Sequence, residues 1–253
     1  MVIEQNESNN PQASAVGPVH EPEKVMTIVE HLDELRARIL RSVAVTLLCF
    51  GVALYFGKSI VNVLERPAGT ITFQALSLEE PLVVYFKVSF YAALVLAFPW
   101  ILFEVASFIS PGLRRNERKI LLPIVICGPL LFMSGVAFAY YLVLPPMLHF
   151  FNSFGQGMSP IHQRLDFYIS LVTTILLYMG LCFQLPIAIF AASFTGLINS
   201  GQLIRIWRYA IFACAVVSAI ITPDPTAFSM LIVMGALVGL YFLSVILLKL
   251  FGR

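Results

Sequence analysis

Residues 227–248 read AFSMLIVMGALVGLYFLSVILL, and none of them carries a charge. A helix needs about 20 consecutive apolar residues to cross the hydrocarbon core of a bilayer. The run therefore predicts a membrane-spanning helix over Ala227–Leu248. Five further apolar runs precede it, and they predict spans at Ile39–Phe56, Leu82–Phe103, Ile120–Leu144, Phe167–Phe194 and Trp207–Ile221.

The fifth predicted span, Trp207–Ile221, is short. At 1.5 Å per residue it reaches roughly 22 Å, against about 30 Å of hydrocarbon. Such a span must thin the bilayer, pack against protein or draw in flanking polar groups. The sixth run is a second candidate for a short span. Pro99, Pro129 and Pro186 lie inside other spans, and they predict kinked helices around a concave shape.

The composition of the whole chain supports a membrane protein. Of its 253 residues, 59% are hydrophobic and 12% are charged, whereas soluble domains have about 45–50% and about 25%. A soluble fold of this size could not hide so much apolar surface, which excludes a soluble enzyme, a disordered chain and a nucleic-acid binder. We therefore predict an all-α integral membrane protein, with one six-helix domain over residues 25–253 and a disordered, polar cytoplasmic tail over residues 1–24.

The loops between the predicted spans differ in charge. Twelve of the 16 Lys and Arg residues fall on one side, three fall on the other, and Lys87 lies within the second span. The positive side is cytoplasmic by the positive-inside rule. Both termini are therefore expected in the cytoplasm.

Three polar residues in or next to the spans are candidates for structural or functional roles. Lys87 lies near the start of the second span, where it either snorkels to the interface or has a function. Gln184 lies within the fourth span, and its amide either joins helices of this chain or docks another membrane helix. Asp224 lies in a Pro-Asp-Pro turn, which Asx-turn chemistry explains.

Two polar segments border the first two spans on the predicted cytoplasmic side. Residues 30–39, EHLDELRARI, have the spacing of an amphipathic helix that runs into the first span, in which Glu34 and Arg38 form an i, i+4 pair. Residues 107–119, SFISPGLRRNERK, contain a Ser-Pro-Gly turn. Glu117 is the single acid among four bases there, and it is either an internal salt-bridge partner or a binding carboxylate.

The chain has no residue pattern of an enzyme. It contains no HExxH or GxxxxGK[ST] motif, no Ser/His/Asp arrangement and no metal-ligand spacing of Cys and His. We therefore expect no catalytic residue, no cofactor and no metal. The remaining alternatives are a binding or translocating membrane protein and a small-solute or ion transporter.

Three segments in this order resemble the TatC family, whose members are the multispanning subunits of the twin-arginine protein translocase. They are residues 31–36 (HLDELR), residues 108–118 (FISPGLRRNER) and residues 222–229 (TPDPTAFS). The resemblance covers roughly residues 26–250 and includes the six spans and the short fifth one. It implies a cup-shaped bundle whose cytoplasmic face binds signal peptides that carry consecutive arginines ahead of an apolar stretch.

The resemblance also implies which residues form that site. Glu34 and Glu117 would face the arginine pair, because two guanidinium groups suit carboxylates with bidentate geometry. The other residues implied at the site are His31, Leu32, Phe108, Pro111, Leu113 and Arg118.

Partners and location follow from the same resemblance. Gln184 occupies a position that is often Glu in the family, and it would contact the transmembrane helix of single-span TatA/TatB-type subunits. Asp224 departs from the pattern, since the turn reads Thr-Pro-Asp-Pro where the family often has Thr-Pro-Pro-Asp. The family exports folded cargo with the proton-motive force, as a homo-oligomer within a larger complex. We expect a multi-pass protein of the plasma (inner) or thylakoid membrane that contacts lipid and binds no nucleic acid.

Overall fold

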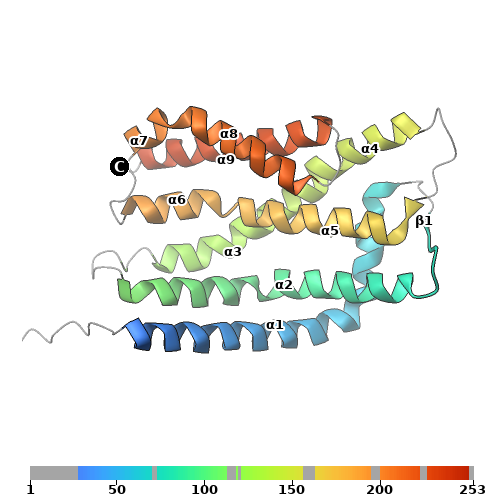
Figure 1. The fold of residues 1–253 in the computed structure, drawn as a ribbon, viewed down its shortest axis with the longest axis horizontal. Helices are drawn as coiled ribbons and strands as arrows, with labels where there is room; N and C mark the ends of the chain where they lie inside the picture. Colours follow the sequence, from blue (N-terminus) through green and yellow to red (C-terminus); the bar gives the residue numbers. More distant parts are fainter. Residues whose placement is uncertain are drawn as a thin grey trace, which may run out of the picture.

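The computed structural model describes residues 28–69, 73–112, 118, 121–155, 163–194, 200–222 and 227–250. The described part is built almost entirely of helices that lie side by side (Figure 1). In chain order the elements are α1 (Ile28–Glu65), η1 (Arg66–Ala68), β1 (Phe73–Gln74), α2 (Glu80–Ile109), η2 (Ser110–Gly112), α3 (Leu121–Phe138), η4 (Ala139–Val143), α4 (Leu144–Gly155), β2 (Gln163–Arg164), α5 (Leu165–Cys182), α6 (Leu185–Phe194), α7 (Ser200–Arg205), α8 (Trp207–Ile221) and α9 (Ala227–Leu250). The predicted tail, residues 1–24, lies outside the described residues.

The prediction of an all-α protein with six apolar spans is confirmed. Five helical stretches in the described part are long and apolar enough to cross a membrane, and α8 is a shorter apolar helix with the predicted bounds of the fifth span. The sixth span is not short, because α9 has 24 residues, or about 36 Å at 1.5 Å per residue.

The first helix begins well before the first predicted span. The amphipathic segment over residues 30–39 continues without a break into the apolar run, so α1 extends over Ile28–Glu65. Its 38 residues make a helix of about 57 Å, which is longer than the hydrocarbon core is thick. The first turns of α1 therefore have room to lie outside the apolar layer.

The fourth predicted span is interrupted rather than continuous. Helix α5 ends at Cys182 and α6 begins at Leu185, with Phe183 and Gln184 between them. Pro186 has no N–H to donate to the carbonyl of Cys182, which weakens the helical ladder at this point. A similar change follows α3, where η4 takes the wider π register, and Pro145 and Pro146 lie in the first turn of α4, which comes next.

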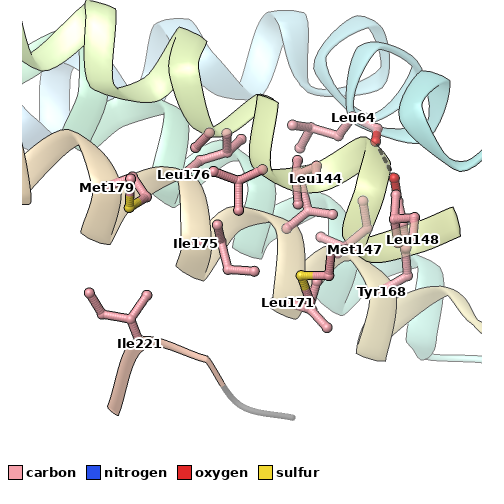
Figure 2. Packing of buried hydrophobic residues seen from close by; sticks show 14 of the residues in the cluster. Leu64, Leu144, Met147, Leu148, Tyr168, Leu171, Ile175, Leu176, Met179 and Ile221 are labelled. Carbon is pink, nitrogen blue, oxygen red and sulfur yellow. Dashed lines mark hydrogen bonds between the residues drawn. The ribbon is translucent and has the colours of Figure 1, made fainter. Parts of the chain in front are cut away.

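The core lies where α5 packs between α1, α2, η4 and α4 (Figure 2). Tyr168 is buried there, and its hydroxyl donates a 2.7 Å hydrogen bond to the carbonyl of Leu64 on α1. Because that carbonyl lies in the last turn of α1, the bond satisfies a group that the helix itself leaves open. Leu171, Ile175 and Met179 continue the buried face of α5. The outer side of α1, in contrast, exposes many large apolar side chains, as a lipid-facing surface does.

Candidate functional site

The start of α1 lies beside the end of α2 because the two helices run antiparallel (Figure 1). At this end the ring of His31 stacks on the ring of Phe108, with centroids 4.2 Å apart and an angle of 8° between the planes. Both residues were predicted at the site from different segments of the sequence. The structure therefore brings the HLDELR segment and the SFISPG segment together.

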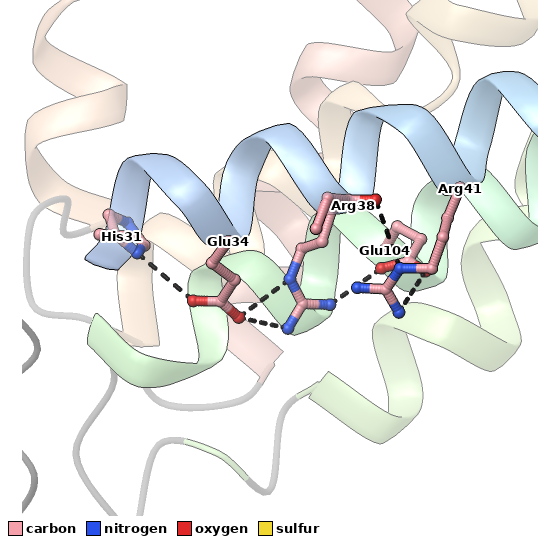
Figure 3. Close-up of polar contacts among 6 residues, drawn as sticks. His31, Glu34, Arg38, Arg41 and Glu104 are labelled. Carbon is pink, nitrogen blue, oxygen red and sulfur yellow. Dashed lines mark hydrogen bonds and ion pairs between the residues drawn. The ribbon is translucent and has the colours of Figure 1, made fainter. Parts of the chain in front are cut away.

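Glu34 lies one turn after His31 and between two basic side chains (Figure 3). Arg38 donates from Nε at 3.0 Å and from Nη2 at 2.5 Å to Glu34 Oε1. This is the i, i+4 pair that the sequence predicted. His31 Nδ1 lies 3.6 Å from Glu34 Oε2. That second oxygen is buried and accepts no hydrogen bond within the described part of the chain.

Glu104 on α2 completes the cluster, and the sequence analysis did not single it out. Its side chain is 2% exposed, and its Oε2 accepts a 2.9 Å hydrogen bond from Arg38 Nη1. Arg41 Nη1 lies 3.2 Å from Glu104 Oε1. Arg38 therefore bridges two carboxylates on two helices (Figure 3). The available signal was a lone acid one residue beyond the predicted end of the second span, where a charge is costly.

An apolar groove of about 480 Å³ runs along α1 and α2 from this cluster. On α1 it is lined by side chains spaced four residues apart, which places them on one face of the helix. The apolar lining consists of Leu35, Ile39, Val43 and Leu47 on α1, and of Phe90, Leu94, Ile101, Val105 and Phe108 on α2. Arg38 and Glu104 also line it. The groove is therefore charged near one end and mainly apolar along the rest of its length.

The other residues predicted at this site are placed as follows. Leu32 is exposed on α1, Pro111 is half-buried in η2, and Arg118 is exposed. Leu113 and Glu117 lie outside the described residues. The predicted pairing of Glu34 with Glu117 is therefore not tested by the structure.

Lys87 joins α2 to α5. Its ammonium group forms an ion pair with Asp166 and donates a 2.7 Å hydrogen bond to Ser170 Oγ. The buried carboxylate of Glu80 accepts backbone hydrogen bonds from Asp166 at 3.0 Å and from Leu76 at 2.8 Å. Lys87 is thus part of a polar connection between two helices rather than a side chain that snorkels freely. Asp224 lies outside the described residues.

Gln184 lies in the break between α5 and α6 and reaches across to α3. Its Nε2 donates a 2.9 Å hydrogen bond to the carbonyl of Gly128. This contact supports the interpretation of Gln184 as a link between helices of this chain. Its Oε1 is buried and accepts no hydrogen bond from any residue the structure describes. The amide oxygen of Gln184 is therefore an unused acceptor.

The helices around Gly128 approach closely. A Cβ atom at Gly128 would lie 2.0 Å from the side chain of Leu102 on α2. Glycine thus lets α2 and α3 approach near the Gln184 contact. Among the described residues there is no group of three His, Cys, Asp or Glu side chains that could hold a metal ion.

The sequence model of the family described as Sec-independent protein translocase protein (TatC) matches residues 30–235. The chain belongs to the TatC family. Curated TatC relatives include those of Synechocystis sp. (36% identical over 90% of this chain and 90% of the relative) and of Helicobacter pylori (36% identical over 87% of this chain and 86% of the relative). The chloroplastic TATC of Arabidopsis thaliana is 36% identical over 91% of this chain and 68% of its own length.

Solved structures agree with this assignment. A crystal structure of the twin arginine translocase receptor TatC superposes with a TM-score of 0.79 at 33% identity, covering 87% of this chain and 99% of that one. The TatC assignment makes the chain a multi-pass membrane subunit of a protein translocase, not an enzyme, in an inner or thylakoid membrane. It replaces the alternative of a small-solute or ion transporter.

Proposed function

We propose that this TatC subunit is the receptor for twin-arginine signal peptides, and that the His31–Glu34–Phe108 end of α1 and α2 is its binding site. The observation that carries the proposal is the position of Glu34. This carboxylate is bonded to Arg38, which lines the charged end of the apolar groove, and one of its oxygens is buried without a hydrogen bond in the described structure. A guanidinium group would supply the missing donors.

The geometry suits arginine better than lysine. A guanidinium is planar and presents its donors as a fork, so it can bond a carboxylate through two parallel hydrogen bonds, whereas an ammonium acts as a point charge. Glu34 takes the first arginine of the pair and Glu117 the second. Leu32, Pro111, Leu113 and Arg118 shape the surroundings of the two acids.

The groove between α1 and α2 takes the apolar stretch that follows the arginines. From Leu35 to Leu47 its α1 wall extends for about 18 Å, at 1.5 Å per residue. Ile39, Val43 and Leu47 are about half exposed or more, so an apolar peptide would cover them. The peptide carries its arginines ahead of its apolar stretch. In the same order, the acids lie at one end of the groove and the apolar lining extends away from them.

The wider role follows the family. The subunit works with single-span TatA/TatB-type partners, as a homo-oligomer within a larger complex, and exports folded proteins with the proton-motive force. Gln184 is the partner contact within the membrane: its Nε2 is used within the chain, whereas its Oε1, which is covered in the subunit alone, accepts a hydrogen bond once a partner helix packs against the α5–α6 break. Gln184→Leu is expected to reduce co-purification of the partners about fivefold, a loss of roughly 1 kcal/mol. Ser134→Ala, which removes only a local bond to Leu131 on α3, should leave it unchanged.

The receptor role is tested by photo-crosslinking in native membranes. A probe is placed beside the arginine pair of a signal peptide, and Arg-Arg and Lys-Lys peptides are compared on the wild type, Glu34→Gln and Glu117→Ala. The proposal expects an adduct that requires Arg-Arg and is lost in both variants. Equal adducts with Lys-Lys, or an adduct that persists in both variants, would overturn it.

A further inference from the structure

The guanidinium of Arg38 is held between the carboxylates of Glu34 and Glu104. Its guanidinium bonds Glu34 with Nε and Nη2 and Glu104 with Nη1, so all three of its nitrogens face the two acids. The side chain is 17% exposed, and it lies between α1 and α2 at the charged end of the groove. In chemical terms, one guanidinium is bound by the carboxylates of two helices.

The two carboxylates are not saturated by Arg38. Glu34 Oε2 and Glu104 Oε1 are both buried, and neither accepts a hydrogen bond from the residues that the structure describes. Buried polar atoms are normally paired, and an unpaired acceptor costs free energy. Glu104 is almost fully buried and lines the groove. Glu104 Oε1 has Arg41 as an ion-pair partner at 3.2 Å but accepts no hydrogen bond from it, and Glu34 Oε2 faces no arginine among the described residues, so each oxygen keeps an acceptor position open.

We propose that Glu104 is an additional acceptor for the guanidinium of the peptide, and that Arg38 is an internal competitor that holds Glu34 and Glu104 in the free protein. This inference rests on the proposed receptor function and adds a residue and an exchange step to it. When the peptide binds, its guanidinium takes over one or both carboxylates, and Arg38 turns away from the cluster. Arg41 keeps its ion pair with Glu104, so that acid is not left without a cation during the exchange.

Such an exchange lowers the affinity of every ligand by the same factor, so the lysine peptide, which bonds the two acids more weakly, is the first to fall below useful affinity. A ligand must replace the hydrogen bonds that Arg38 gives up, and Arg38 makes forked bonds to Glu34. A lysine ammonium offers a single point of charge and cannot reproduce the fork. It would therefore displace Arg38 less well than a guanidinium does. The forked geometry of the two acids sets the preference for arginine, and the internal arginine sets the threshold that a ligand must exceed to bind.

The test measures binding of a synthetic signal peptide to the full chain in detergent, with Arg-Arg and Lys-Lys versions. The variants are Arg38→Gln, Glu104→Gln and the double variant. The control is Arg205→Gln, which removes an exposed charge on α7 at the same end of the bundle (Figure 1). Arg38→Gln is expected to tighten Arg-Arg binding about tenfold and Glu104→Gln to weaken it about tenfold, as for one charged hydrogen bond. The double variant should lose most of the gain.

A second measurement uses the wild type and does not depend on the folding of any variant. The reaction of Arg38 with phenylglyoxal, followed by mass spectrometry, should accelerate when the Arg-Arg peptide is bound and not when the Lys-Lys peptide is present. If Arg38→Gln binds the Arg-Arg peptide more weakly than the wild type, or if that peptide leaves the reactivity of Arg38 unchanged, Arg38 is not a competitor of the peptide. Unchanged binding by Glu104→Gln would remove Glu104 from the site.

The two proposals fail in different ways. If the wild type binds Arg-Arg and Lys-Lys peptides equally, the receptor function itself is wrong, and the inference falls with it. If the wild type prefers Arg-Arg but Arg38→Gln binds more weakly, only the competitor is wrong.

Discussion

Lys87 illustrates what a single charge does between two packed helices of this protein. Its ion pair with Asp166 is partly screened, since the two side chains are 28% and 29% exposed. Removing one partner leaves the other without its counter-charge in a half-buried place. Lys87→Met is expected to lower the free energy of unfolding by about 1–2 kcal/mol. For a chain of this size that corresponds to a fall of roughly 3–6 °C in the thermal midpoint, measured in detergent.

The matched control for Lys87→Met is Lys58→Met, which removes a lysine from an exposed position on α1. Its midpoint should stay within about 1 °C of the wild type, because surface substitutions rarely matter. The charge-reversed pair, Lys87→Asp with Asp166→Lys, should recover part of the loss. Equal midpoints for Lys87→Met and Lys58→Met would show that the ion pair does not stabilise the fold.

The sequence predicted some individual residues and missed others for physical reasons. The pairing of Glu34 with Arg38 follows from helical spacing alone, so it could be predicted. The stacking of His31 on Phe108 needed the antiparallel packing of two helices, which resemblance to a family supplied and periodicity could not. Glu104 was missed because its partners come from another helix, and nothing in its local sequence identifies Arg38 or Arg41.

The contact between α3 and the α5–α6 break depends on a position without a side chain. A Cβ atom at Gly135 would lie 2.7 Å from Phe183 Cγ and 2.8 Å from the carbonyl oxygen of Met179. The backbone oxygen cannot move aside without shifting α5. Gly135→Ala is therefore expected to destabilise the protein by about 1–3 kcal/mol, the usual effect of overpacking. The thermal midpoint in detergent would measure it.

Gly239 provides the control for this substitution. It lies within α9, and a Cβ atom there would meet nothing within 4 Å. Gly239→Ala should be neutral or stabilising by up to about 1 kcal/mol, because alanine favours the helix. If Gly135→Ala proved as harmless as Gly239→Ala, α3 and α5 would have to be free to move apart at Gly135.

The helices themselves were predicted far better than their interruptions. Helix α8 has the predicted bounds, and α9 ends two residues beyond the predicted end, since hydropathy determines such lengths. The break after Cys182 was not predicted, although Pro186 indicated a kink. A proline removes one hydrogen bond, but whether the helix bends or stops depends on the groups nearby that satisfy the freed carbonyls. That information lies in tertiary packing and not in the local sequence.

At the level of the whole molecule, the α1–α2 pair differs from the rest of the bundle. The α5 core buries its apolar side chains against several helices (Figure 2), whereas α1 has one main neighbour and keeps most of its surface outside. A groove between two such helices can accept an added apolar segment without disturbing the core. The site at the groove's charged end is therefore formed between α2, which packs against α3 and α5, and α1, which reaches the main cluster at its far end through Leu64.

Two adjacent leucines on α1 allow a test of whether peptide binding uses this groove. Leu47 lines the groove, and Leu48, which is 73% exposed, does not. Both lie at almost the same depth in the predicted first span, so glutamine at either position should have a similar cost of membrane insertion. Leu47→Gln is expected to reduce crosslinking of the apolar part of an Arg-Arg peptide about tenfold, because burying an amide without a partner costs roughly 1–3 kcal/mol. Leu48→Gln should crosslink like the wild type. Equal losses in both variants would indicate a general effect on the helix, and no loss in Leu47→Gln would mean that the groove accommodates lipid while the peptide's apolar stretch binds elsewhere.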